Sequence, residues 1–354
     1  MKVNFRKIKG FLYKYRYSLA IVFVALVAAV GIAWYLLGQN IVFKAPAFNL
    51  IKPKDDRVVA PLTGELVDPS VITKRPIAVI IENYTDARPQ SGYNDADIVY
   101  ETLAEGGITR TLAIFQSKAS TEIGPVRSAR PYFIDWLTEY SALFAHVGGS
   151  YAGLNLIQQI KVPDLNQFYN ATAYWRSSDR EAPHNVYTTT DKLYAAAKAN
   201  GLEITATVPA FNFKKDADIK QRSASEKVDI DFSYSDYHVT YNYDSVSNTY
   251  LRSIAGVIAK DKNTGVQIAP KNVIVELTPI SSYTDPTGEP AENITTIGTG
   301  KGILFQDGKA TQITWSKSSR EARTKYLDIN GRDCQLNPGQ TWIEVVPTGN
   351  NVTY

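Results

Sequence analysis

An uncharged apolar segment near the N terminus places the strongest constraint on this 354-residue chain. Residues 18–37 (SLAIVFVALVAAVGIAWYLL) contain no charged side chain. As a helix rising about 1.5 Å per residue, the segment would be roughly 30 Å long, which matches the hydrocarbon thickness of a bilayer. Trp34 and Tyr35 lie near its end and are residue types typical of the membrane interface. The sequence therefore predicts a transmembrane helix over 18–37.

The residues that flank this segment indicate its orientation. Only basic charges precede it: Lys2, Arg6, Lys7, Lys9, Lys14 and Arg16. The positive-inside rule keeps this basic tail (1–17) in the cytoplasm and predicts that everything after Leu37 lies outside. Two alternatives stay open, a signal peptide cleaved near 31–33 (Gly-Ile-Ala) and a buried globular helix. We favour an uncleaved signal anchor, because the apolar run is longer than a usual signal core and continues past that point.

Composition limits the remaining classes. Hydrophobic content of 44% and aromatic content of 11% are typical of a packed globular protein. The formal net charge of +3 gives no indication of nucleic-acid binding. Cys334 is the only cysteine, so it forms no intramolecular disulfide, and no cysteine follows the apolar segment to accept a lipid. We interpret Cys334 as an inert small residue.

Three segments with different patterns follow the anchor. Residues 38–75 are interrupted by prolines and are interpreted as an extracytoplasmic linker. Strands and helices alternate over 76–203, from the apolar run PIAVIIEN (76–83) to a helix over 191–200, which predicts an α/β domain with a mixed sheet. Short β runs separated by turns, including Asp307-Gly308 and Asn330-Gly331, predict a mostly antiparallel β domain over 204–354.

Two arginines precede a predicted helix. Arg127 and Arg130 lie in EIGPVRSARPYFIDWL (122–137), where Pro131 suits the first helical position. Positive charges at this end oppose the helix dipole at a cost of some tenths of a kcal/mol, which makes physical sense if an anion is bound between them. The alternative is that each arginine pairs with a local acid such as Glu122 or Asp135.

Two further stretches are candidates for the same ligand site. The loop YWRSSDREAPHN (174–185) has no regular period, and Trp175 is a candidate stacking platform for a sugar ring. The strand-to-helix junction HVGGS (146–150) can expose backbone N–H groups to an oxyanion, although it is not a Walker or dinucleotide motif. The predicted ligand-binding residues are Arg127, Arg130, Gly148, Gly149, Ser150, Trp175, Arg176, Arg180, His184 and Asn185. The alternatives are a solvated surface loop and a buried His146.

An enzyme would need proton-transfer groups. His184 can serve as a general acid or base, and Glu101, Glu105 and Asp179 are candidate carboxylates. Cross-strand ion pairs with Arg110 explain the two glutamates equally well. The three histidines, His146, His184 and His238, lack a metal-binding spacing, so we predict no metal and no cofactor.

Several of these motifs together resemble the YerB-like family of bacterial envelope lipoproteins. They are PLTGE (61–65), ARPQSGYNDADIVYETLAEGGITR (87–110), GPVRSARPYFIDW (124–136), HVGGS (146–150), APHNVYT (182–188) and NPGQTWIEVVP (337–347). The resemblance runs from about residue 60 to the C terminus and implies a membrane-tethered extracytoplasmic protein with an α/β part and a β part. It implies no established activity and no catalytic residue. Members are commonly lipid-anchored through a cysteine, which this chain lacks in that place.

Two functions from different classes are consistent with the sequence. The first is a binding module of the cell membrane that captures an anionic or saccharide envelope ligand in an arginine-rich cleft. The second is an envelope hydrolase or transferase that uses His184 or a nearby carboxylate. The first is favoured, because arginines and glycine junctions are plentiful while a nucleophile with a base is not visible.

Overall fold

The computed structural model describes residues 16–38 and 55–354. Most of the predicted cytoplasmic tail (1–17) and residues 39–54 of the predicted linker lie outside the described residues. The chain divides into two units, residues 1–55 and 56–354.

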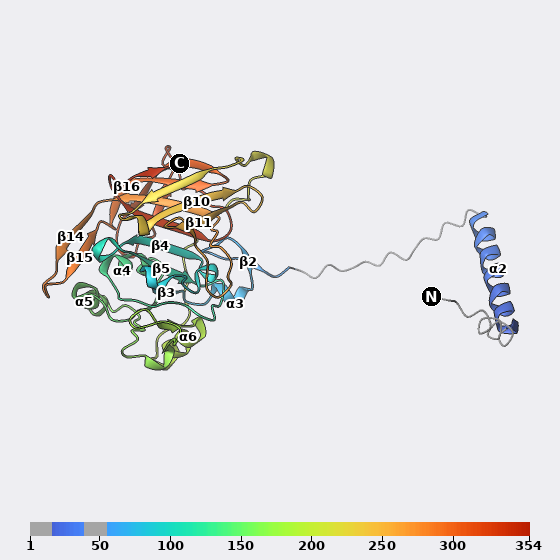
Figure 1. Ribbon diagram of the computed structural model, residues 1–354, viewed down its shortest axis with the longest axis horizontal. Helices are drawn as coiled ribbons and strands as arrows, with labels where there is room; N and C mark the ends of the chain where they lie inside the picture. The colour runs from blue at the N-terminus through green and yellow to red at the C-terminus, as the bar shows by residue number, and fades with distance from the viewer. Residues whose placement is uncertain (1–15, 39–54) are drawn as a thin grey trace, which may run out of the picture. The chain divides into compact units, whose positions relative to one another are not determined.

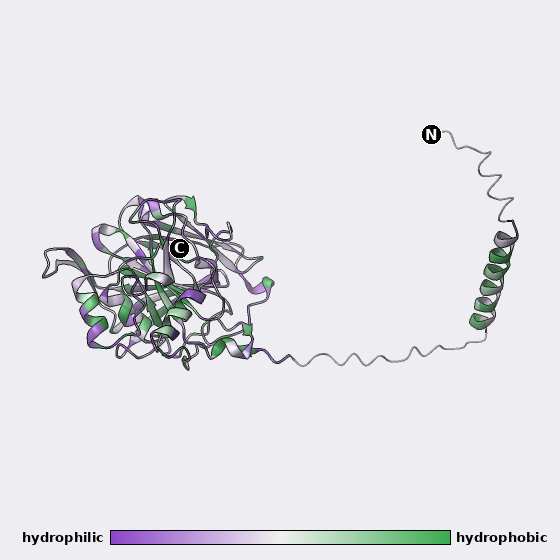
Figure 2. Ribbon diagram, turned by 90° about the horizontal axis from the view of Figure 1, so that it is seen from below, coloured by the Kyte–Doolittle hydropathy of each residue, from purple (hydrophilic) through white to green (hydrophobic). Residues whose placement is uncertain are grey.

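The first unit contains the predicted apolar helix. Helix α2 (Arg16–Gly38) includes a stretch, Ala20–Gly38, with a mean hydropathy of 2.6, long and apolar enough to cross a membrane. Figure 2 shows hydrophobic residues along the length of this helix. The sequence prediction of an apolar N-terminal helix is confirmed.

A nine-stranded mixed sheet organises the second unit (Figure 1). Its strand order is β18-β17-β16-β13-β19-β4-β5-β3-β6. The pairs β13–β19, β19–β4 and β3–β6 are parallel and the other neighbours are antiparallel. The strands are β3 (Ile77–Glu82), β4 (Ile98–Leu103), β5 (Thr109–Phe115), β6 (Leu143–Ala145), β13 (Asn272–Thr278), β16 (Gly298–Gln306), β17 (Lys309–Lys317), β18 (Lys325–Leu327) and β19 (Thr341–Pro347). Strands from both predicted domains, 76–203 and 204–354, therefore share one sheet.

An antiparallel five-stranded sheet covers part of one face. It contains β9 (Lys227–Asp231), β10 (His238–Asp244), β11 (Thr249–Ile254), β12 (Val257–Ile258) and β20 (Val352–Thr353). Burial alternates along β10, and the inward Val239 and Tyr241 join a core cluster with Val273 and Phe305 of the large sheet. The predicted class, an α/β part with a mixed sheet followed by a mostly antiparallel β part, is confirmed.

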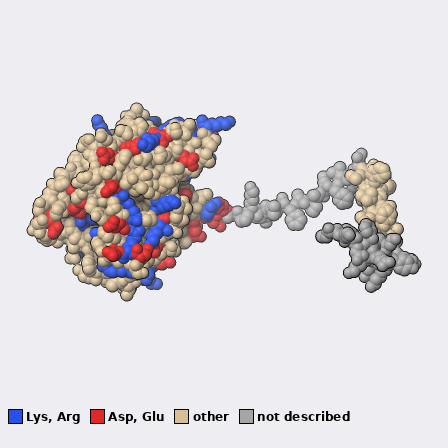
Figure 3. Space-filling view, viewed as in Figure 1, with Lys and Arg blue, Asp and Glu red and all other residues tan. Residues whose placement is uncertain are grey.

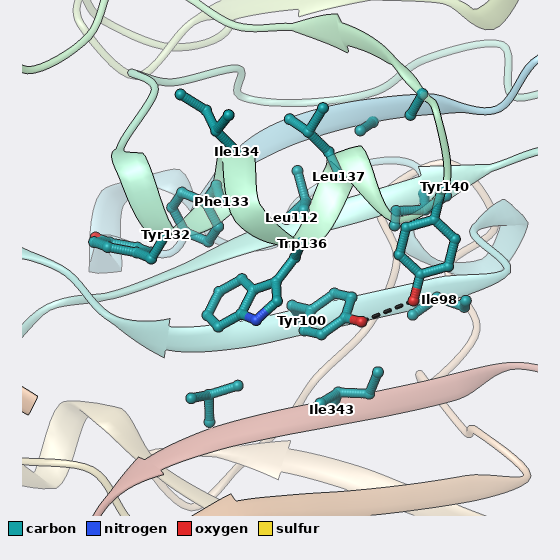
Figure 4. Packing of buried hydrophobic residues seen from close by; sticks show 14 of the residues in the cluster. Ile98, Tyr100, Leu112, Tyr132, Phe133, Ile134, Trp136, Leu137, Tyr140 and Ile343 are labelled. Atoms are coloured by element: carbon teal, nitrogen blue, oxygen red, sulfur yellow. Dashed lines mark hydrogen bonds between the residues drawn. The ribbon is translucent and has the colours of Figure 1, made fainter. Parts of the chain in front are cut away.

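Helices cover the rest of the sheet. Helix α4 (Pro131–Thr138) lays Phe133, Trp136 and Leu137 onto Tyr100 of β4, with the Trp136 and Tyr100 rings stacked 4.9 Å apart (Figure 4). Helix α5 (Tyr151–Gln159) packs on the same side, and α6 (Thr190–Ala199) buries its apolar residues in a separate cluster. Pro131 is the first residue of α4, as the sequence predicts.

The folded unit begins earlier than the predicted linker allows. Residues 58–72 form β1 (Val58–Val59), β2 (Leu66–Val67) and α3 (Pro69–Ile72), and Leu62 is fully buried in the main core. The linker prediction over 38–75 is therefore wrong for this part, because prolines here shape turns on the domain surface. The remaining elements are two hairpins, β7 (Tyr174–Arg176) with β8 (Val186–Thr188) and β14 (Ile280–Thr284) with β15 (Pro290–Ile294).

Candidate functional site

The end of β3 places Glu82 beside Arg127. A backbone bridge joins Ile81 to Val126, and the Arg127 amide donates to the Ile80 carbonyl at 3.0 Å. The segment that follows Gly124 thus lies along the end of β3. Arg127 Nε comes within 3.0 Å of Glu82 Oε1, and the Glu82 side chain is almost fully buried.

The 174–185 loop brings His184 to the same carboxylate. The β7–β8 hairpin carries this loop, and a bridge between Ile123 and Thr188 fixes it beside the arginine segment. His184 Nδ1 is 2.9 Å from Glu82 Oε2, and its ring stacks on Tyr84 at 5.2 Å. Glu82 therefore bridges Arg127 and His184, and the two predicted stretches converge.

Arg130 is the N-cap residue of α4 and forms a two-pronged ion pair with Glu105. Arg130 Nε binds Glu105 Oε1, and Nη2 lies 2.7 Å from Oε2. Burial acts to raise the pKa of Glu105, but the Arg130 hydrogen bond and charge outweigh it and hold that pKa below its ordinary value. The predicted local partners were wrong: Arg127 and Arg130 pair with Glu82 and Glu105, whereas Asp135 pairs with Arg320 and Glu122 accepts from Ser91.

Arg110 on β5 is the site residue that the sequence reasoning missed. It lies opposite Glu82 in the β3–β5 register and is only 8% exposed. Within the described residues its guanidinium makes no hydrogen bond, its Nε and Nη1 are buried without a partner, and its nearest carboxylate, Glu105, is 3.9 Å away. Burial first, then the nearby charges of Arg130 and Arg127, lower the pKa of Arg110. The sequence signal that could have identified Arg110 as a site residue was its position inside the largely apolar strand TRTLAIF (109–115).

We call Arg110, Arg127 and Arg130 with Glu82 and Glu105 the arginine corner. Figure 3 shows basic and acidic side chains gathered together near the middle of the face in view, while much of the surrounding surface is uncharged. Three guanidinium groups at the corner face two carboxylates, and within the described residues neither the Arg110 guanidinium nor Arg127 Nε has a hydrogen-bonded acceptor.

The other predicted residues of the 174–185 loop are held by contacts within the protein. Arg176 donates to Asn185 Oδ1 at 2.7 Å, and Arg180 donates to the carbonyls of Asp86 and Pro89. The Trp175 ring stacks on Tyr187 with centroids 6.1 Å apart. These contacts order the loop, and His184 is its member that reaches the arginine corner.

The HVGGS junction lies beside the arginines but uses most of its backbone donors internally. A parallel bridge joins Gly149 to Ala129. The Gly148 amide donates to Asn166 and the Ser150 amide to the Ala129 carbonyl, while the Ser150 hydroxyl caps α5. The expected oxyanion cradle is therefore not free at Gly148 or Ser150. His146 is fully buried and bonds Gly148 and Asp164, in agreement with the buried alternative.

The candidate proton-transfer groups differ in what they can do. Glu101 is fully buried and bonds Asn83, Thr109 and Arg252, so it has no access to a ligand and does not pair with Arg110 as the sequence suggested. Asp179 is held by Lys262, whose hydrogen bond lowers the pKa of that carboxyl to about 2. His184 alone combines partial exposure with a ring nitrogen, Nε2, that makes no hydrogen bond to the described residues.

No metal or thiol chemistry is indicated at the corner. Across residues 16–38 and 55–354, no group of three or more His, Cys, Asp or Glu side chains is placed to hold a metal ion. Cys334 is half-buried, and burial, followed by the Asp328 and Asp333 charges, raises the pKa of its thiol to about 11.

The fold defines the class of the chain: an α/β protein with a mixed sheet and a mostly antiparallel β part, preceded by an apolar N-terminal helix. The chain belongs to a family of proteins of unknown function: residues 62–203 match the model described as "Protein of unknown function (DUF3048) N-terminal domain", and residues 228–343 match its C-terminal domain. It is 36% identical over 296 residues to "Putative lipoprotein YerB" of Bacillus subtilis (strain 168), covering 82% of this chain and 87% of that protein.

A solved structure supports the same assignment. The crystal structure of YerB protein from Bacillus subtilis matches with a TM-score of 0.76 and 33% identity, covering 84% of this chain and all of that one. The family resemblance inferred from the sequence motifs is therefore confirmed. A lipoprotein relative and an apolar N-terminal helix together support association with a membrane.

Proposed function

We propose that the protein is a binding module that captures an anionic ligand of the cell envelope at the arginine corner. The observation that carries this proposal is Arg110. Its side chain is 10% exposed, its Nε and Nη1 are buried, and within the described residues the guanidinium has no hydrogen-bond partner. Leaving a buried charged donor unsatisfied costs free energy, and a bound oxyanion would satisfy it.

The neighbouring groups support the same ligand chemistry. Both carboxylates of the corner are already engaged, Glu82 by Arg127 and His184, and Glu105 by Arg130. Arg127 contacts Glu82 through Nε, and its two terminal nitrogens make no hydrogen bond to the described residues, so they can act as a fork for two oxygens. Helix α4 has no side-chain cap, and its N-terminal dipole adds to the positive potential. A phosphate, sulfate or carboxylate group fits this donor set.

Inorganic phosphate is the probe that tests the corner. We expect the full-length protein, in a detergent without sugar or phosphate such as lauryldimethylamine oxide, to bind phosphate in isothermal titration. Arg127→Gln should weaken binding about tenfold, because it removes one charge-assisted fork. Arg332→Gln is the matched control: Arg332 is an exposed arginine paired with Asp328 elsewhere on the surface. Equal loss in both variants, or no saturable binding by the unsubstituted protein, would contradict the proposal.

We further propose that α2 is an uncleaved single-pass anchor with the N terminus in the cytoplasm and residues 39–354 outside. The basic residues before the helix support this orientation. Protease added to intact spheroplasts should degrade the folded unit, and the purified protein should retain residues N-terminal to α2. Protection of the folded unit until the membrane is lysed would contradict this topology.

A second candidate function rests on His184. Glu82 orients this ring through Nδ1 and leaves Nε2 free, as in sites where a carboxylate positions a histidine for proton transfer. A hydrolase or transferase should release soluble sugar or phosphate from isolated cell envelopes, and His184→Asn should abolish the release. A pure binding module should release nothing.

A further inference from the structure

We propose that a groove beside the arginine corner is a second ligand site, which binds a glycan chain of neutral sugar rings. The groove consists of two adjacent pockets of about 560 and 480 Å³ that share Ser128 and Gly149 in their walls. It runs past the N terminus of α5, between the 163–170 loop and the turn that joins β14 to β15. An elongated, open groove of this size suits successive rings of an oligosaccharide better than one compact ion.

Exposed aromatic rings line both pockets. Phe168 and Tyr169 border one pocket with 68% and 80% of their surface exposed, and Tyr151 borders the other at 51%. None of the three stacks on another aromatic ring within the described part of the chain. The Phe168 ring lies against Gly148, where an added Cβ would come within 3.0 Å of it, so a glycine is needed beneath this platform. Flat apolar surface left open to solvent is typical of a binding surface, and ring C–H groups of a sugar can pack on it.

Planar polar side chains stand next to these rings with hydrogen-bonding capacity to spare. Asn166 is only 4% exposed, and its Oδ1 accepts from the Gly148 and Phe168 amides. Its Nδ2 makes no hydrogen bond to the described residues. Asp164 uses Oδ1 for His146 and the Asn166 amide, which leaves Oδ2 as a free acceptor. An amide donor and a neighbouring carboxylate acceptor match the paired hydroxyl groups of a sugar.

The charges of the groove decide between neutral and anionic glycans. Its basic lining residue, Arg130, is already neutralised by Glu105. Asp164, Asp285 and Glu289 add acidic groups along both pockets. A polyanionic glycan would be repelled here, whereas uncharged rings would not. The groove and the arginine corner share the Arg130–Glu105 pair but differ in chemistry, and substitutions at Tyr169 and Arg127, which each belong to one of them, test them separately.

The N-acetylated chitotetraose (four N-acetylglucosamine units, called chitotetraose below), a neutral oligosaccharide, is the probe for the groove. We expect the full-length protein in lauryldimethylamine oxide to bind it in saturation-transfer NMR and isothermal titration, and Tyr169→Ala to weaken binding at least tenfold. Tyr234→Ala is the matched control, because this tyrosine is 64% exposed but lines neither pocket. Both tyrosines are exposed, so neither substitution should affect folding.

The outcomes separate the two sites. Chitotetraose binding that Tyr169→Ala removes and Arg127→Gln leaves unchanged supports the groove, whatever the result with phosphate. Absence of binding to both chitotetraose and cellotetraose, or equal binding by Tyr169→Ala and the unsubstituted protein, overturns it. Tighter binding of a sulfated tetrasaccharide than of chitotetraose, lost on Tyr169→Ala, overturns the neutral-ligand assignment.

Discussion

Arg110→Met is expected to raise the free energy of unfolding by about 1–2 kcal/mol and, at the same time, to remove phosphate binding. In the free protein, Arg110 is a buried charge with its nearest carboxylate at 3.9 Å and two like charges nearby. Replacing this charge by an apolar side chain of similar length removes its desolvation cost, and we expect that gain to exceed the loss of the 3.9 Å contact with Glu105 by about 1–2 kcal/mol. The same substitution deletes the corner arginine whose contact with a glutamate is the longest. Urea unfolding followed by tryptophan fluorescence, and phosphate titration, measure the two effects.

Arg252→Met is the contrasting control. Arg252 is also buried, but its guanidinium bonds Glu101 at 2.5 Å and lies over the Trp342 ring at 4.6 Å. Removing it leaves Glu101 as an uncompensated buried charge, which costs about 3–5 kcal/mol. If Arg110→Met destabilises the protein as Arg252→Met does, Arg110 is a structural tie and the anion site must lie elsewhere.

If Arg110→Met instead raises the free energy of unfolding and removes phosphate binding, the arginine corner lowers the stability of the protein in order to bind an anion. An Arg130 variant cannot separate binding from stability. Arg130 forms a two-pronged pair with Glu105, so removing it leaves a partly buried carboxylate without its ion-pair partner. Loss of binding in an Arg130 variant would be mixed with a loss of folding. Arg110 and Arg127 are therefore the informative positions.

Local patterns predicted the parts of the fold that depend on neighbours in sequence. The apolar run of β3 and the start of α4 at Pro131 both follow from short-range rules. The pairing of β19 with β4 joins strands more than 200 residues apart, and a hydrophobic pattern does not choose between such partners. The shared sheet was missed for this reason.

The same limit applies to the candidate site, where residues close in sequence were predicted and their distant partners were not. The sequence brought attention to Arg127, Arg130 and His184, but Glu82, which joins two of them, is 102 residues from His184. Side chains of β4 alternate between the two faces of the sheet. Tyr100 faces α4, so the sequence pattern could have placed Glu101 on the opposite face, away from the arginine corner. The missing hydrogen bonds of Arg110 depend on every surrounding element, so no local pattern reveals them.

Two glutamates of neighbouring strands share one buried cluster beneath the five-stranded sheet. Glu344 of β19 lies opposite Glu101 of β4 in parallel register, and both are fully buried. Arg252 bonds Glu101, while Tyr241 donates to Glu344 Oε1, and Glu344 Oε2 has no hydrogen-bond partner in the part of the chain that the structure describes. Burial, and next the Glu101 charge, raise the pKa of Glu344 to about 8, against the opposing effect of Arg252. The charge of Arg88 also reaches Glu101, but burial and the Glu101 charge outweigh Arg252 at Glu344, so the folded state favours the protonated form of Glu344.

The free energy of unfolding is therefore expected to fall as the pH rises from about 5 to 8. In this range the unfolded chain has lost the Glu344 proton while the folded protein still binds it, so the slope is negative, up to about 1.4 kcal/mol per pH unit for one proton. Glu276, whose pKa burial and then the Glu139 charge raise to about 7, adds to the fall. Glu344→Gln keeps an acceptor for Tyr241 and removes the titrating proton, so urea unfolding at several pH values should show a flatter slope than in the unsubstituted protein. Glu321→Gln, at an exposed position, should leave the slope unchanged. A free energy of unfolding that is constant or rises between pH 5 and 8 in the unsubstituted protein would contradict this prediction. It would mean that Glu344 is ionised in the folded state and that contacts other than the Arg252 pair stabilise its charge.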